Sequence, residues 1–142
     1  MSAYTILATL PGIPSIFYGD EAGLEGYHDP FNRMPYPWGR EDHNLINYYK
    51  RIGQIRRDND VYKEGKFKLL HIDEETLAFE RYDEEYSYIT FVNNSTQYRK
   101  VEFSSPATAL SQSDEDGECT AFELPAYTAQ IFKTKRHGDI YF

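Results

Sequence analysis

The feature that most constrains this chain is a change in the spacing of its apolar residues near residue 60. Beyond that point apolar and polar residues alternate with a period of two, which predicts β-strands. Candidate strands lie at residues 66–71, 76–82, 86–93, 99–103, 118–124 and 129–133. Short strands at this spacing favour an antiparallel sandwich.

Turn signals separate these candidate strands. They are the runs Asp73-Glu74-Glu75, Asp83-Glu84-Glu85, Asn93-Asn94-Ser95 and Asp114-Glu115-Asp116-Gly117. The third run also contains overlapping glycosylation sequons, but a hairpin turn is the interpretation we favour for it. The tail, residues 135–142, is charged and then ends in Ile-Tyr-Phe, a pattern that fits a last strand or a disordered end equally well.

The first 58 residues have a different organisation. Residues 3–10 predict a helix stopped by Pro11, and the apolar run 15–18 predicts a short strand buried on both faces of a parallel sheet. Residues 19–39 form a long loop, and apolar residues at three-to-four spacing predict a helix from Asp42 to residue 58. This order is one β/α unit, which cannot close a sheet alone, so we expect the chain to be part of something longer.

Composition excludes several classes of function. The chain has 142 residues, a net charge of -8 and a pI near 4.9, the wrong sign for a surface that follows nucleic-acid phosphates. The most apolar stretch, residues 3–18, is interrupted by Pro11 and Pro14 and reads as neither a membrane span nor a secretory signal. We therefore expect neither a nucleic-acid partner nor a membrane partner.

The sequence also lacks the common motifs for metals, phosphates and covalent catalysis. Cys119 is the single cysteine, which excludes an internal disulfide and suits a reducing compartment, so a cytoplasmic location is expected. No phosphate-binding glycine pattern, HExxH or Gly-x-Ser-x-Gly occurs, and the four histidines are scattered. We expect no metal site and no cofactor.

The loop at residues 19–39 carries the side chains most suited to chemistry. Asp20 and Glu21 follow the predicted strand directly, at the end where parallel α/β folds bind ligands. Asp29, Arg33 and Trp38 lie further along the same loop. A carboxylate and a guanidinium can hydrogen-bond sugar hydroxyls while an aromatic face packs on the ring, so the loop suits a carbohydrate site.

A structural explanation of the same loop stays open. In it, Asp20, Glu21 and Arg33 form a charge network that fixes the loop, while Tyr36 and Trp38 cover a barrel edge. The aromatic content is similarly ambiguous, because 13 Tyr, 9 Phe and 1 Trp can form a core or provide platforms for sugars.

Three motifs in order resemble a known family. The runs PGIPSIFYGDEAGLEG, DPFNRMPYPWG and LINYYKRIGQIRR look like the eighth strand, its loop and the eighth helix of an α-amylase family glycoside hydrolase, close to neopullulanases, cyclomaltodextrinases and α-glucosidases. The resemblance implies an α+β fragment: residues 1–58 would end a (β/α)8 TIM barrel, and residues 59–142 would be the all-β antiparallel sandwich called domain C.

The resemblance also implies an activity and a site. Such enzymes cleave α-1,4 and in some members α-1,6 glucosidic bonds by a retaining mechanism, with three catalytic carboxylates that would lie upstream of this chain, so the chain alone is expected to be inactive. Asp29 and Arg33 match positions that hydrogen-bond glucose in an α-glucan oligosaccharide, whereas Asp20, Glu21 and Trp38 would support the barrel mouth.

The sequence supports two further expectations. A non-catalytic sugar-binding role, or a role as an amylase-like partner subunit, is the alternative function. Residues 3–18 and the inner face of the 42–58 helix look shaped to pack on absent barrel strands, so we expect the fragment to associate with itself through that apolar surface.

Overall fold

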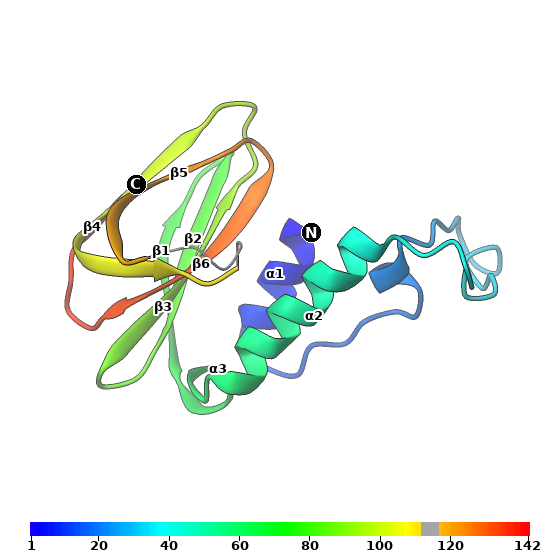
Figure 1. The fold of residues 1–142 in the computed structure, drawn as a ribbon, viewed down its shortest axis with the longest axis horizontal. Coiled ribbons are helices and arrows are strands. Elements are labelled where there is room, and N and C mark those ends of the chain that lie inside the picture. The colour runs from blue at the N-terminus through cyan, green and yellow to red at the C-terminus, as the bar shows by residue number, and fades with distance from the viewer. Residues whose placement is uncertain (112–116) are drawn as a thin grey trace.

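A β lobe and a helical arm make up the protein (Figure 1). The computed structural model describes residues 1–111 and 117–142, so most of the turn predicted at residues 114–117 lies outside the described part. The β lobe holds the sheet, and the arm carries two packed helices with the loop between them at its far end (Figure 1). The arm therefore presents the candidate loop at a distance from the sheet.

The β lobe is one antiparallel sheet with strand order β1-β2-β3-β6-β4-β5, and β7 pairs with β4. Its strands are β1 (Lys66–Ile72), β2 (Thr76–Tyr82), β3 (Tyr86–Asn93), β4 (Arg99–Ala109), β5 (Cys119–Leu124), β6 (Thr128–Lys135) and β7 (Ile140–Tyr141). The six predicted strands are all present, and the tail forms a strand rather than a disordered end.

The sheet folds into two layers at β4. The first residues of β4 pair with β5 and the last ones with β6, with a register shift between Glu102 and Ala107. Phe103 and Phe122 therefore both reach Phe132, with ring centroids 5.2 and 4.8 Å apart. Ala78, Ile89, Phe91, Val101 and Leu124 complete this buried core. The predicted antiparallel β domain is confirmed.

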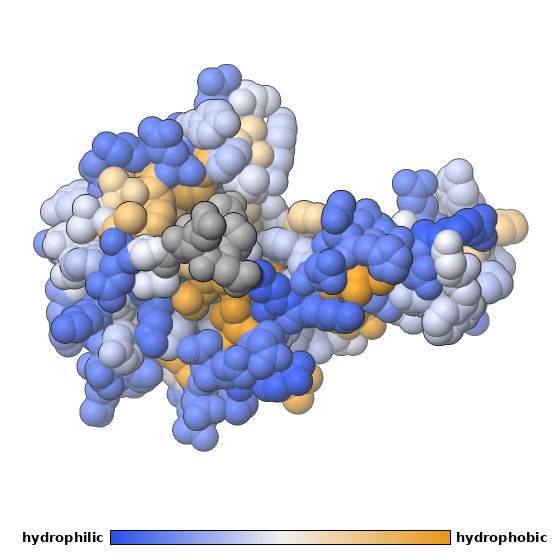
Figure 2. Space-filling model, viewed as in Figure 1, coloured by the Kyte–Doolittle hydropathy of each residue, from blue (hydrophilic) through white to orange (hydrophobic). Residues whose placement is uncertain are grey.

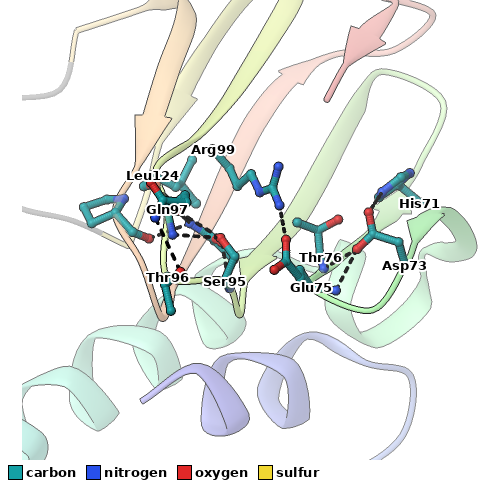
Figure 3. Close-up of polar contacts among 11 residues, drawn as sticks. His71, Asp73, Glu75, Thr76, Ser95, Thr96, Gln97, Arg99 and Leu124 are labelled. Carbon is teal, nitrogen blue, oxygen red and sulfur yellow. Dashed lines mark hydrogen bonds and ion pairs between the residues drawn. The ribbon is translucent and has the colours of Figure 1, made fainter.

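Side chains of the turns explain why the strands end where the sequence predicts. Asp73 accepts hydrogen bonds from the backbone N–H groups of Glu75 and Thr76, and Asp83 accepts the same pair of bonds in the next hairpin. Figure 3 shows the first of these turns beside His71, which contacts the same carboxylate at 2.9 Å. These local bonds offer the backbone a turn in place of further strand.

Asn93, the first residue of the overlapping sequons, is fully buried. Its side-chain N–H group donates to the carbonyls of Gln97, Leu124 and Pro125, at 2.8 to 3.1 Å, and its oxygen accepts from Ser95 (Figure 3). Asn93 thus fastens the β3–β4 turn to the end of β5. The run is a turn, as predicted, but the hairpin interpretation is wrong, because β6 lies between β3 and β4 in the sheet and the described residues of these two strands do not pair.

The arm consists of α1 (Ser2–Thr9) and α2 (His43–Asp58), and the short α3 (Val61–Glu64) joins it to the sheet. Asp42 caps α2 as predicted, because its carboxylate accepts a hydrogen bond from the N–H of Leu45 at 3.0 Å. The rings of Tyr4 and Tyr49 stack 3.8 Å apart between the helices. Ile52 is fully buried there, against Ile131 of β6.

The strand predicted at residues 15–18 is absent. Residues 13–17 belong to no helix or strand, and Ile16 and Phe17 are 42% and 52% exposed. A strand needs a neighbour to accept and donate its backbone hydrogen bonds, and the described residues place none beside this segment. The prediction of a buried strand is therefore wrong for this chain taken alone.

The sequence predicts that the helices of the arm leave apolar faces exposed, and this prediction is also partly wrong. Thr5, Ala8 and Thr9 of α1 are at most 1% exposed, because α2 and the sheet cover them. Exposed apolar surface remains at residues 13–18. Figure 2 shows a mostly hydrophilic face with apolar patches on the β lobe and on the arm. Among the described residues, no helix is long and apolar enough to cross a membrane.

Candidate functional site

The loop begins with a tight backbone turn that is fastened to α2. Gly19 has φ of 93°, a conformation that favours glycine, and its N–H donates to the Glu21 carboxylate at 2.9 Å. Residues Asp20–Ala22 form one 3-10 turn, and the carbonyl of Ala22 accepts a hydrogen bond from the N–H of Asp42 at 3.0 Å. Glu21 therefore shapes the start of the loop.

Asp29 and Arg33 meet on the outer part of the loop. The Arg33 Nε lies 2.9 Å from Asp29 Oδ1, and the two side chains are 70% and 62% exposed. The peptide bond between Asp29 and Pro30 is cis, and the carbonyl of Pro30 accepts a hydrogen bond from the N–H of Arg33. This turn brings together the two residues for which the resemblance implies glucose binding.

The alternative charge network does not form. Arg33 pairs with Asp29, whereas Glu21 bonds to the backbone of Gly19. Among the described residues, the structure records no ion pair between Arg33 and either Asp20 or Glu21. The Asp29–Arg33 pair is therefore separate from the carboxylates at the start of the loop and is open to solvent.

The same loop carries aromatic side chains with exposed faces. Trp38 is 80% exposed, and its ring lies 4.7 Å from that of Tyr36. Phe31 is 63% exposed and contacts His28 edge to face. An exposed aromatic face, a carboxylate and a guanidinium on one loop are groups that can bind a sugar ring. Trp38 does not cover a neighbouring element within the described residues.

Two titrating groups in and directly after the loop have shifted pKa values. Partial desolvation, together with the negative charges of Glu21 and Glu41, raises the pKa of Tyr36. Hydrogen bonds from the backbone of Glu41 itself and of Gly39 lower the pKa of Glu41. Both groups therefore keep their usual charge states at neutral pH, and neither has the poised pKa of a catalytic acid or base.

A small hollow lies at the foot of the loop, with a volume of about 240 Å³. It is lined by Phe17, Tyr18, Asp20, Leu24, Gly26, Tyr27 and Asn32. The side-chain oxygen of Asn32 is buried and has no hydrogen-bond partner in the protein. Asn32 was not among the residues that the sequence predicted for the site, although it directly precedes Arg33, which was.

The described residues show no candidate metal site. The described part of the chain contains no group of three or more His, Cys, Asp or Glu side chains placed to hold a metal ion. Cys119 is exposed and free, at the start of β5.

Two named proteins have sequences similar to part of this chain. An amylopullulanase of Thermoanaerobacter thermohydrosulfuricus is 48% identical over 71 residues, which are 50% of this chain and 5% of that protein. A cyclomaltodextrinase of Thermoanaerobacter pseudethanolicus is 40% identical over 95 residues, or 66% of this chain and 17% of that protein. No family model matches the chain.

The solved structures extend the match to almost the whole chain. The α-amylase of Geobacillus thermoleovorans, solved with acarbose, has a TM-score of 0.79 and 28% identity over 93% of this chain and 32% of its own. The chain matches the C-terminal part of α-amylase family glycoside hydrolases. Its β lobe corresponds to the C-terminal β domain of these enzymes, and it spans 32% or less of each of the three proteins named here.

Proposed function

We propose that the chain is the C-terminal portion of a retaining glycoside hydrolase that acts on the α-1,4 and in some cases α-1,6 bonds of malto-oligosaccharides, cyclodextrins or pullulan. The names of its relatives support this substrate class. The solvent-exposed Asp29–Arg33 ion pair, on a loop that also carries exposed aromatic rings, is the observation in the chain itself that carries the proposal.

Within this proposal, Asp29 and Arg33 bind one glucose unit. A carboxylate accepts hydrogen bonds from two adjacent hydroxyl groups, and the guanidinium donates to ring or hydroxyl oxygens. Because the two groups already lie 2.9 Å apart, one sugar can contact both with little rearrangement. Asp20, Glu21 and Trp38 support the mouth of the barrel around that sugar.

The arm is the last β/α unit of a TIM barrel in the same proposal. Residues 13–18 would become the eighth strand when a neighbouring barrel strand accepts their backbone hydrogen bonds, and α2 would be the eighth helix. Residues 1–58 then end the barrel, and residues 59–142 form domain C. Retaining enzymes need two carboxyl groups about 5 to 5.5 Å apart across the scissile bond. We assign that pair to the upstream barrel, so the chain alone is inactive.

Binding and hydrolysis need separate tests. For binding, the chain is titrated with maltotriose while NMR follows the indole N–H of Trp38 and the side-chain Nε–H of Arg33. We expect saturable shifts with a Kd in the millimolar range, and their loss in Asp29→Asn and Arg33→Met. Arg57→Met, on the exposed last turn of α2, is the matched control and is expected to bind like the parent chain.

For hydrolysis, the chain and a longer protein that carries the upstream barrel are incubated with pullulan, β-cyclodextrin and maltotriose, and reducing ends are measured. We expect activity only in the longer protein. If the longer protein binds these sugars and cleaves none of them, the alternative role of a non-catalytic binding protein or partner subunit replaces the enzyme. In the binding test, NMR shifts that persist in both Asp29→Asn and Arg33→Met would show that Asp29 and Arg33 are not part of the sugar site.

A further inference from the structure

The end of α1 is held by cations that come from other parts of the chain. The last carbonyls of a helix have no partner within the helix, and positive charge is favourable beside them. α1 has no basic residue in its last turn. The carbonyls at this end instead accept hydrogen bonds from Arg56 of α2 and Arg81 of β2.

Arg56 fixes the path of the chain as it leaves the helix. Its guanidinium donates to the carbonyl of Ala8 at 2.6 Å and also to those of Leu10 and Gly12. Leu10 already has extended backbone angles, with ψ of 157°. The turn from α1 toward residues 13–18 is therefore fastened to α2.

Arg81 fastens the same helix end to the β lobe. Its side chain is 2% exposed and donates to the carbonyls of Thr9 and Tyr62, both at 3.3 Å, and of Gly65 at 2.9 Å. Thr9 ends α1, whereas Tyr62 and Gly65 belong to α3 and its C-terminal cap. One guanidinium of β2 thus joins the ends of two helices.

The setting of Arg81 is unusual for a buried cation. The structure records no carboxylate partner for it in the described part of the chain, and its Nε has no hydrogen-bond partner. Burial lowers its pKa, and the nearby positive charge of Arg56 acts in the same direction. A buried charge is retained only where other groups compensate it, and here the carbonyls of the helix ends do so.

From these contacts we infer that Arg81 is a positioning residue, through which the β lobe fixes the end of α1 and the start of the segment leading to the loop at residues 19–39. Removing its guanidinium frees the carbonyl of Thr9 from the sheet and leaves Arg56 as the remaining anchor. The inference concerns protein contacts alone and does not depend on the proposed sugar chemistry.

The test is amide hydrogen exchange of the whole chain, measured residue by residue for residues 6–10 and for the β core. Arg81→Met is compared with Arg136→Met, which removes another largely buried guanidinium of the β lobe, one that bonds to Glu80 and Ser87 rather than to α1. Global unfolding is measured for each variant, so that exchange can be compared at matched stability.

We expect exchange at residues 6–10 to rise at least tenfold in Arg81→Met beyond the change in the β core, and to follow the core in Arg136→Met. Arg81→Lys keeps the positive charge but loses the planar guanidinium with its several N–H donors. Its exchange at residues 6–10 is expected to lie between those of Arg81→Met and Arg136→Met. Arg81→Lys also supplies the comparison if Arg81→Met does not fold. Equal effects of the Arg81 and Arg136 variants on residues 6–10 would overturn the inference, whether or not the chain binds maltotriose.

Discussion

The carboxylate of Glu80 lies inside the β lobe and accepts hydrogen bonds from Arg136 at 3.1 and 3.3 Å. Glu80 is 4% exposed, whereas Arg136 lies just after β6 with its guanidinium 3.6 Å from the centre of the Tyr82 ring. The pair connects the second strand of the lobe to the turn that leads into β7. It is thus a buried charge whose partner comes from a distant part of the chain.

Replacing Arg136 with Met is expected to lower the free energy of unfolding by about 1 to 3 kcal/mol, because a buried carboxylate loses its charged partner. Urea denaturation followed by circular dichroism measures the change. Lys100→Met is the matched control, since its ion pair with Glu102 is about half exposed, and exposed pairs contribute about 0 to 1 kcal/mol. Equal losses in the two variants would contradict the burial argument.

The N-cap of α2 gives a second prediction. Asp42→Ala removes the acceptor of the Leu45 N–H and is expected to destabilise the protein by about 1 kcal/mol. Asp42→Asn keeps an acceptor oxygen and is expected to change stability by a few tenths of that at most. Thermal unfolding of both variants checks this, and the cap has no energetic role if the Ala and Asn variants melt together.

The turn at Asp73 gives a prediction about pH. The contact with His71, followed by hydrogen bonds from Glu75 and Thr76, lowers the pKa of Asp73 (Figure 3). A folded-state pKa below the unfolded value of about 3.9 stabilises the protein above that pH, and the contribution is lost as the pH falls toward the folded-state pKa.

Urea midpoints measured between pH 7 and pH 2 should therefore fall more steeply with acid in the parent chain than in Asp73→Asn. The amide oxygen can still accept the backbone bonds of the turn, so the variant is expected to fold. His71→Gln removes the largest cause of the shift and is expected to give an intermediate slope. Parallel curves for the parent and Asp73→Asn would exclude this contribution.

The β lobe could be predicted because its information is local. Alternating residues give the strands, and an Asp or Asn side chain that bonds to nearby backbone shapes two hairpins and the β3–β4 turn. The register shift in β4 and its pairing with both β5 and β6 could not be read this way. They depend on Phe103, Phe122 and Phe132 meeting in the core, which is a property of the assembled sheet.

The Asp29–Arg33 pair of the candidate site is also a local feature of the sequence. Asp29 and Arg33 are four residues apart, so a single turn brings them together. The strand at residues 15–18 failed because an apolar run specifies burial but does not supply the neighbour that buries it. Nothing in the local sequence predicts the contact of Arg81 with Thr9, because the two residues are 72 positions apart.

The exposed segment at residues 13–18 gives the last prediction, which concerns association of the chain with itself. Ile13 is 96% exposed and Phe17 is 52% exposed. Apolar surface costs about 25 cal/mol per Å² in water, so contact between two copies of this segment would be favourable. We propose that it is the surface through which the chain self-associates.

Sedimentation velocity over a hundredfold range of concentration is expected to show a rising average mass for the parent chain. Ile13→Ser combined with Phe17→Ser is expected to reduce the association at least tenfold. Tyr98→Ser removes an aromatic ring that is 69% exposed on the β lobe, and it should associate like the parent because it leaves the segment intact. A parent chain that stays monomeric at the highest concentration, or three proteins that associate equally, would show that residues 13–18 do not drive association.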